Sequence, residues 1–177
     1  HNLASVNPSL EGTKAAWWRI ADTLERLGVP ATVSTCGRAA ELSPWLIHDA
    51  VARGHEISCH GWRWEKHAHM EEAKEREIIA RTVKALTEIA GTRPVGWHTR
   101  STPSPNTRRL LVEEGGFLYD SDDYSDDLPF QVEVEGKPHL VLPYSFDTND
   151  MHYHQGFHRF VSARDFALEA LSAAAIC

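Results

Sequence analysis

Extended segments alternate with helical ones along most of this 177-residue chain, and that alternation restricts the fold more than any other feature. Apolar residues recur at helical spacing, and glycine or proline stands at most segment boundaries. We predict helices over 14–27, 44–53, 70–90, 104–114 and 162–175, and strands over 31–35, 55–59, 94–97 and 117–119. Strands joined by helices pair in parallel, with helices covering the sheet. The sequence therefore predicts an α/β fold.

The second half of the chain adds a different element. The extended segments 131–134 and 139–142 flank Gly136 and Lys137, which predicts a β-hairpin-like pair of strands. The sequence has no repeats, low-complexity tracts or linkers, and its length suits one hydrophobic core. We therefore expect a single domain over residues 1–177.

Composition restricts the partners. The net charge of -7 argues against nucleic acid, which requires clustered Lys and Arg. No apolar run approaches the roughly 20 residues of a membrane span, and no signal peptide is visible. The three cysteines, Cys36, Cys59 and Cys177, do not form the spacing of a disulfide framework. These features predict a reduced, soluble, cytoplasmic protein with no nucleic-acid or membrane partner.

The segment 54–64 carries the most chemistry. It is a short extended run that ends at His60 and opens into a turn containing Trp62 and Trp64. Because side chains alternate along a strand, Glu56 and His60 share one face. They are either a satisfied polar pair at a strand end or part of a site. Imidazole titrates near neutrality, so His60 is the best candidate for acid–base work.

This segment resembles the second motif of the polysaccharide deacetylase (NodB-homology) superfamily. Metal-using members carry a second histidine four residues after the first, and here that position is Trp64, whose indole N–H can only donate. The substitution is similar to that of the cofactor-independent allantoinase branch. Further runs that resemble this branch are 96–100, 104–109, 113–122, 126–129 and 147–151.

The resemblance implies a distorted (β/α) barrel of the polysaccharide deacetylase type. The chain begins and ends with a predicted helix, so the resemblance would leave the first and last strands outside this sequence. The acidic first motif of the family and its late histidine motif have no counterpart here. We therefore expect an incomplete barrel, most simply from a truncated chain, because an open barrel exposes strand edges.

Candidate site residues follow from strand ends, where such folds place their active residues. We expect catalytic roles for His60, Asp120 and Glu56, with one carboxyl group titrating high if Asp120 faces Glu56 or His60. The alternatives are a surface acidic loop for 120–127 and core or surface positions for the others. The candidate substrate-binding residues are Trp64, Trp97, Arg100, Asp126, Asp147 and Asn149.

A metal is not expected. His152, His154 and His158 with Asp147 and Asp150 invite a metal interpretation, but their spacing fits no closed zinc pattern. The resemblance leaves one alternative open, a single divalent cation such as zinc, as in the metal-using members.

The resemblance implies hydrolysis of a non-peptide C–N bond. The leading hypothesis is a metal-independent enzyme like allantoinase, opening a hydantoin-type ring. The first alternative is an N-deacetylase of polysaccharide, peptidoglycan or chitin, and the second is a truncated, non-catalytic binding or assembly subunit. The expected partner is a small ureide or an N-acetylated sugar, and the resemblance also suggests a homo-oligomer.

Overall fold

The computed structural model describes residues 10–145, 149, 164–165 and 167–168. Its strands form a six-stranded sheet in the order β1-β2-β3-β4-β6-β5. The strands β1, β2, β3, β4 and β6 pair with their neighbours in parallel. At the edge, β5 pairs antiparallel with β6. The strands are β1 (Thr32–Thr35), β2 (Glu56–Cys59), β3 (Gly96–Trp97), β4 (Tyr119–Asp120), β5 (Phe130–Val134) and β6 (Lys137–Val141).

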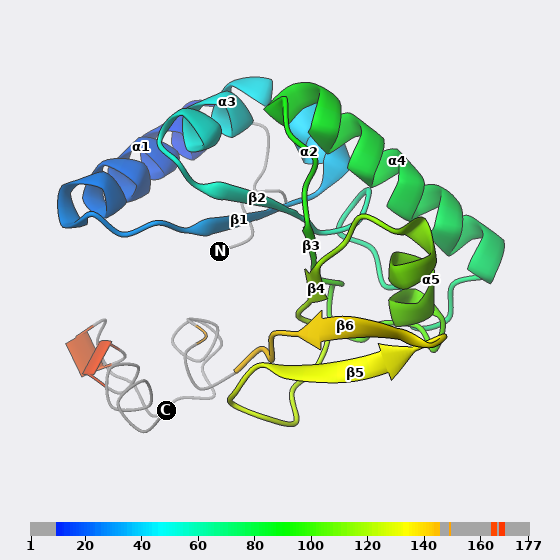
Figure 1. The fold of residues 1–177 in the computed structure, drawn as a ribbon. Helices are drawn as coiled ribbons and strands as arrows, with labels where there is room; N and C mark the ends of the chain where they lie inside the picture. Colours follow the sequence, from blue (N-terminus) through cyan, green and yellow to red (C-terminus); the bar gives the residue numbers. More distant parts are fainter. Residues whose placement is uncertain (1–9, 146–148, 150–163, 166, 169–177) are drawn as a thin grey trace.

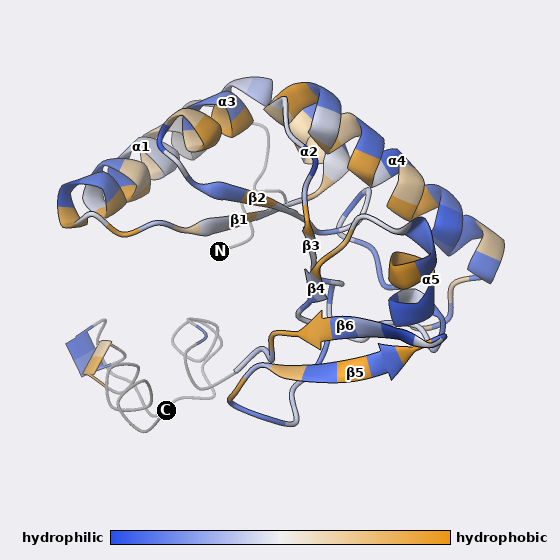
Figure 2. Ribbon diagram, viewed as in Figure 1, coloured by the Kyte–Doolittle hydropathy of each residue, from blue (hydrophilic) through white to orange (hydrophobic). Residues whose placement is uncertain are grey.

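The helices lie along the outer side of the curved sheet (Figure 1). They are α1 (Leu10–Leu27), α2 (Gly37–Leu42), α3 (Pro44–Ala52), α4 (Glu72–Ala90) and α5 (Thr107–Glu114). The α4 helix alternates between apolar and polar residues along its length (Figure 2), as expected for a helix with one buried face. Among the described residues, no helix is both long and apolar enough to cross a membrane.

The predicted alternation is confirmed, including the parallel pairing and the hairpin of β5 and β6. Two local predictions were wrong. The short helix α2 follows β1 directly and was not predicted. The helix expected from Ser104 begins at Thr107, because the Ser104 hydroxyl accepts the backbone N–H of Asn106 at 3.0 Å in a preceding turn. Of the predicted helix 162–175, the structure describes 164–165 and 167–168, which are helical.

One core fills the space between the helices and the sheet. Apolar side chains from α3, α4 and α5 pack there against Ile57, Cys59 and Trp97 of the sheet. The indole of Trp17 is 3% exposed and donates to the Asp49 carboxylate at 2.7 Å, which fastens α1 to α3. Burial of this apolar surface is the main force that holds the helices on the sheet.

Gly96 allows two central strands to lie close together. A Cβ atom on this residue would stand 2.2 Å from the ring of Tyr119, its register partner on β4. A side chain at position 96 would therefore displace Tyr119, whose hydroxyl donates to Glu56 at 2.9 Å. The absence of a side chain on β3 is what lets Tyr119 cross toward β2.

In the described part of the chain, β1 and β5 are the two outer strands of the sheet, which does not close into a full barrel. The open arrangement agrees with the expected incomplete barrel, whereas the single domain over residues 1–177 stays a prediction.

Truncation of a core leucine should test the packing. Leu86 on α4 is 0% exposed, so Leu86→Ala should lower the free energy of unfolding by about 2–5 kcal/mol. Leu42→Ala on α2 is the matched control, since that side chain is 64% exposed and should change stability by less than about 0.5 kcal/mol. Urea unfolding followed by circular dichroism measures both. Equal effects of the two substitutions would contradict the assignment of the core.

Candidate active site at the carboxyl ends of the strands

Four polar or aromatic side chains meet where parallel strands end. His60 follows β2, His98 follows β3, Asp122 follows β4 and Tyr144 follows β6. Parallel strands bring their carboxyl ends to one edge of a sheet, which is where ligand sites form in such folds. The backbone ladder continues into this edge, because the His98 N–H donates to the Cys59 carbonyl at 2.9 Å.

His60 has a defined tautomer. Its ring is buried, and Nδ1 lies 2.5 Å from the backbone carbonyl of His98, which can only accept a hydrogen bond. Nδ1 therefore carries the proton, and Nε2 keeps a free lone pair. Burial lowers the pKa of His60, and the bond to the His98 carbonyl offsets only part of that effect. A neutral imidazole with an available Nε2 is suited to accept a proton.

His98 lies parallel to His60. The ring centroids are 5.3 Å apart with an interplanar angle of 3°, and His98 also stacks with Tyr144 at 4.9 Å. Nδ1 of His98 lies 2.9 Å from the carbonyl of Ser121 and 3.4 Å from a carboxylate oxygen of Asp122. As at His60, an acceptor facing Nδ1 requires the proton there.

Asp122 is the carboxylate that reaches this pair of imidazoles. It accepts the backbone N–H and the hydroxyl of Thr99, both at 2.6 Å, and its side chain is only 4% exposed. The indole of Trp97 in turn donates to the Thr99 hydroxyl at 2.8 Å. These bonds hold Asp122 against His98. In the sequence it was one of several aspartates in an acidic run, and nothing distinguished it.

Asp120 occupies a different environment from the one we expected. Its carboxylate is 0% exposed and accepts bonds from Arg108 at 2.7 and 3.0 Å and from His139 at 3.0 Å. Burial by itself would raise the pKa of Asp120, but the hydrogen bonds from His139 and Arg108 outweigh it and lower the pKa to about 2. The carboxylate of Asp120 is bonded to Arg108 and His139 and not to Glu56 or His60, so the condition for a high titration is not met and its contacts are those of a structural ion pair.

Glu56 lies at the opposite end of β2 from His60. The two residues are four positions apart, which is roughly 13 Å along an extended chain. The Glu56 carboxylate accepts the hydroxyls of Thr32 at 2.7 Å and Tyr119 at 2.9 Å. His60 lies just past the end of β2, and the structure does not bring the two side chains together. Glu56 joins β1, β2 and β4 instead.

The tryptophans predicted to contact substrate divide into one core residue and one surface residue. Trp97 is 0% exposed and packs edge-on against Phe117 and His67, so we no longer propose it as a substrate contact. Trp64 is 42% exposed, and the Arg100 guanidinium lies 4.1 Å from its ring centroid. Arg100 also donates to the Trp64 carbonyl at 3.1 Å, which pairs the two loops at the rim.

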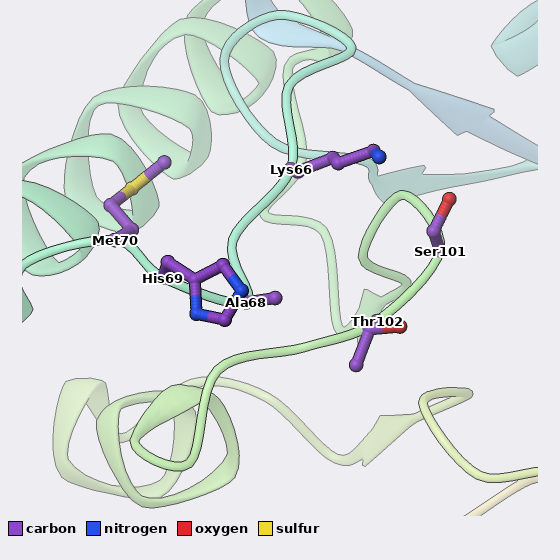
Figure 3. Close-up of a pocket in the computed structure, with 6 residues that line it drawn as sticks. All are labelled: Lys66, Ala68, His69, Met70, Ser101 and Thr102. Carbon is purple, nitrogen blue, oxygen red and sulfur yellow. The ribbon is translucent and has the colours of Figure 1, made fainter.

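A hollow lies beside this rim. Lys66, His69 and Met70 line it from one loop, and Ser101 and Thr102 line it from the loop that follows Arg100 (Figure 3). Its lining does not include His60 or His98. The loops that carry Trp64 and Arg100 therefore continue directly into the walls of this hollow.

The remaining predicted substrate residues are placed only in part. Asp126 is exposed, and its carboxylate accepts the backbone N–H groups of Asp127 and Leu128 within its own loop. The Asn149 amide donates to the Tyr144 hydroxyl at 2.6 Å, which links it to the aromatic stack. Asp147, together with Asp150, His152, His154 and His158, lies outside the described residues.

A buried carboxylate that the sequence did not reveal supports both site loops. Glu75 on α4 is 0% exposed and accepts bonds from His67 at 2.9 Å and from the hydroxyls of Ser104 and Thr107, both at 2.5 Å. The loop after β2 and the loop after β3 are thereby attached to one helix. In the sequence Glu75 stands in a run of charged residues at the start of α4, so nothing marked this glutamate as inward-facing.

The side chains at hand do not fit a zinc site. A protein zinc site needs about three ligands, and the indole of Trp64 cannot be one. Within residues 10–145, 149, 164–165 and 167–168, no group of three or more His, Cys, Asp or Glu side chains could hold a metal ion. We therefore derive no step through a metal.

Comparison with known proteins identifies the family. The sequence pattern of the polysaccharide deacetylases matches residues 11–117. The chain belongs to the polysaccharide deacetylase family. A Schizosaccharomyces pombe protein assigned to the polysaccharide deacetylases is 30% identical over 158 residues, which cover 80% of this chain and 49% of that protein. The chain spans about half the length of the curated relatives it matches.

Two solved structures confirm the predicted fold type. A protein from Pseudomonas aeruginosa PAO1, described as a probable polysaccharide deacetylase, is 45% identical with a TM-score of 0.83, over 90% of this chain and 53% of the other. The allantoinase Puue is 40% identical with a TM-score of 0.85, over 99% of this chain and 62% of the other. The polysaccharide deacetylase fold and the allantoinase likeness inferred from motifs are thus both found.

The ion pair of Asp120 should make stability depend on acid pH. The ordinary carboxyl pKa of 3.8 falls to about 2 in the folded protein, so the bound carboxylate contributes stability above pH 4 that is lost as pH falls toward 2. Asp120→Asn should lower the free energy of unfolding at pH 7 by about 2 kcal/mol, with the deficit shrinking between about pH 4 and pH 2.

Urea unfolding at several pH values measures this deficit. Asp127→Asn is the control, because it removes the same charge from an exposed position in the following loop. A deficit that stays constant down to pH 2 would contradict the ion-pair assignment.

Proposed function

We propose that this protein hydrolyses a non-peptide C–N bond without a metal, as an allantoinase-like member of its family. The observation that carries the proposal is His60, a buried neutral imidazole with Nδ1 bound to a carbonyl and Nε2 available. The second histidine of metal-using relatives is replaced here by Trp64, whose ring is paired with Arg100. A histidine that is not committed to a cation can act directly as a base.

The residues at this edge supply the parts that C–N hydrolysis requires. Nε2 of His60 takes a proton from water as the water oxygen attacks the substrate carbonyl. The developing oxyanion needs hydrogen-bond donors. Arg100 has them, and its Nε has no hydrogen-bond partner among the described residues. We assign Arg100 to the carbonyl or ureido oxygen and Trp64 to the face of the substrate ring.

The likeness to the allantoinase Puue supports a ureide substrate with a hydantoin-type ring. We assign the N–H groups of such a ring to Asp147 and Asn149, which follow β6 in the sequence. Asp126 stays a candidate for the same role. A homo-oligomer stays a prediction.

The second candidate function is N-deacetylation of a sugar polymer. Its support is the family match itself and the likeness to the Pseudomonas aeruginosa protein and to the Schizosaccharomyces pombe relative. Both reactions hydrolyse an amide-type C–N bond, so the same edge of the sheet would serve either one. Substrate and metal requirement distinguish them.

A chelator experiment separates the two candidates. The full-length protein should be assayed with allantoin and with an N-acetylglucosamine oligomer, before and after dialysis against EDTA. We expect turnover of allantoin that survives the chelator. Turnover of the sugar alone, lost with EDTA and restored by zinc or cobalt, would establish the deacetylase instead. Turnover of neither would favour the non-catalytic binding subunit.

His60→Gln should abolish the activity while leaving the fold intact. Loss of a general base lowers kcat by roughly 100- to 10,000-fold. His69→Gln is the matched control, because His69 is an exposed histidine on the following loop and should keep full kcat. Steady-state kinetics and thermal melts measure both variants. An unchanged kcat in His60→Gln would remove His60 from the mechanism.

A further inference from the structure

We propose that His98, held by Asp122, is the general acid that protonates the leaving nitrogen in the reaction for which His60 is the base. The inference rests on the proposed function and extends it to a second histidine. No catalytic role was predicted for His98 from the sequence, although its position just past a short strand, like those of His60 and Asp120, favoured a single site at the strand ends.

The first support is the shared geometry of the two rings. They are parallel, with centroids 5.3 Å apart, and each directs Nδ1 at a backbone carbonyl, that of His98 for His60 and that of Ser121 for His98. Neither Nε2 atom has a hydrogen-bond partner within the described residues. The two adjacent rings therefore leave the same atom, Nε2, without a hydrogen bond to the described residues.

The second support is the difference between their surroundings. Two imidazoles in contact resist being charged together, so a positive charge on one ring disfavours a positive charge on the other. The Asp122 carboxylate lies 3.4 Å from Nδ1 of His98, where it offers an imidazolium a counter-charge. His60 has only a carbonyl at Nδ1, and its burial disfavours the charged form.

The charged and titratable groups around the pair favour the same assignment. His60 is faced by His98 and His67, which oppose a second positive charge, and by Asp122 at longer range. His98 is faced by His60, Asp122 and the ring of Tyr144. The negative charge therefore lies nearest to His98. When neighbouring surroundings separate two titratable groups in this way, one serves as acid and the other as base.

The step balances as follows. Nε2 of His60 takes a proton from water while the oxygen bonds to the carbonyl carbon, and the carbonyl electron pair becomes the oxyanion. As the C=O bond re-forms, the C–N bond breaks and its electron pair takes the proton from Nε2 of His98. His60 then releases its proton to solvent and His98 gains one. One amide and one water become a carboxylic acid and an amine.

A comparison of leaving groups tests the role of His98. The full-length His98→Gln and His60→Gln proteins should be assayed with allantoin and with 4-nitrophenyl acetate, whose leaving phenolate needs no proton. We expect His98→Gln to lose at least 100-fold in kcat on allantoin but less than 10-fold on the ester, roughly the size of a general-acid contribution. His60→Gln should lose on both. Equal losses on both substrates in His98→Gln would overturn the proposal.

An NMR titration tests the pair without any turnover. We expect His98 to hold its extra proton less firmly in Asp122→Asn, because the counter-charge is lost. The midpoint of His60 should rise in His98→Gln, because the neighbouring positive charge is removed. Asp127→Asn, an exposed change in the same loop, should move neither. Unmoved midpoints in Asp122→Asn would overturn the proposal even in an active enzyme.

The two experiments fail differently. Shifted midpoints without turnover of allantoin or the ester would reject the proposed function and the acid role with it. The NMR result would then show only that Asp122 and His98 influence the protonation of the pair. Turnover with unmoved midpoints would leave the proposed function standing and reject His98 alone.

Discussion

The site depends on the parallel register of β2 and β3. That register pairs Cys59 with Trp97, so the His98 N–H meets the Cys59 carbonyl and the chain leaves both strands at the same level. The His98 carbonyl is then within reach of Nδ1 of His60. A shift of one residue would turn every side chain of one strand to the other face. The tautomer of His60, and the proposed role of this residue as a base, therefore rest on backbone pairing.

Two aspartates separated by one residue illustrate how a strand end assigns roles. Asp120 closes β4 and points to Arg108 of α5 and His139 of β6, where its charge is fully matched. Asp122 lies just beyond the strand and reaches Thr99 and His98. Both carry the same charge, but Asp120 holds α5 on the sheet, whereas Asp122 places a negative charge beside His98 at the edge where chemistry is proposed. Their surroundings, and not their residue type, separate them.

The loops around this edge are supported from below by polar contacts. Glu75 bonds His67 in one loop and Ser104 in the other, at 0% exposure. A buried carboxylate that lost these donors would be left unsatisfied, which is costly inside a protein. The pairing of Arg100 with Trp64 joins the same two loops at the rim. Glu75 holds the two loops at their base and the Arg100–Trp64 pair holds them at the rim, so the residues they carry keep a defined geometry.

The sequence by itself determined the alternating α/β order, the parallel sheet, the family and the position of His60 at a strand end. These follow from local signals: helical spacing, glycine and proline boundaries, and the run from Gly54 to Trp64. Only the tertiary structure decided that Asp122 lies against His98, that Asp120 and Glu56 are bound elsewhere, and that Trp97 is core. The physical reason is that local sequence sets where a strand ends, whereas the partner of a side chain there depends on which distant helix or strand packs against it.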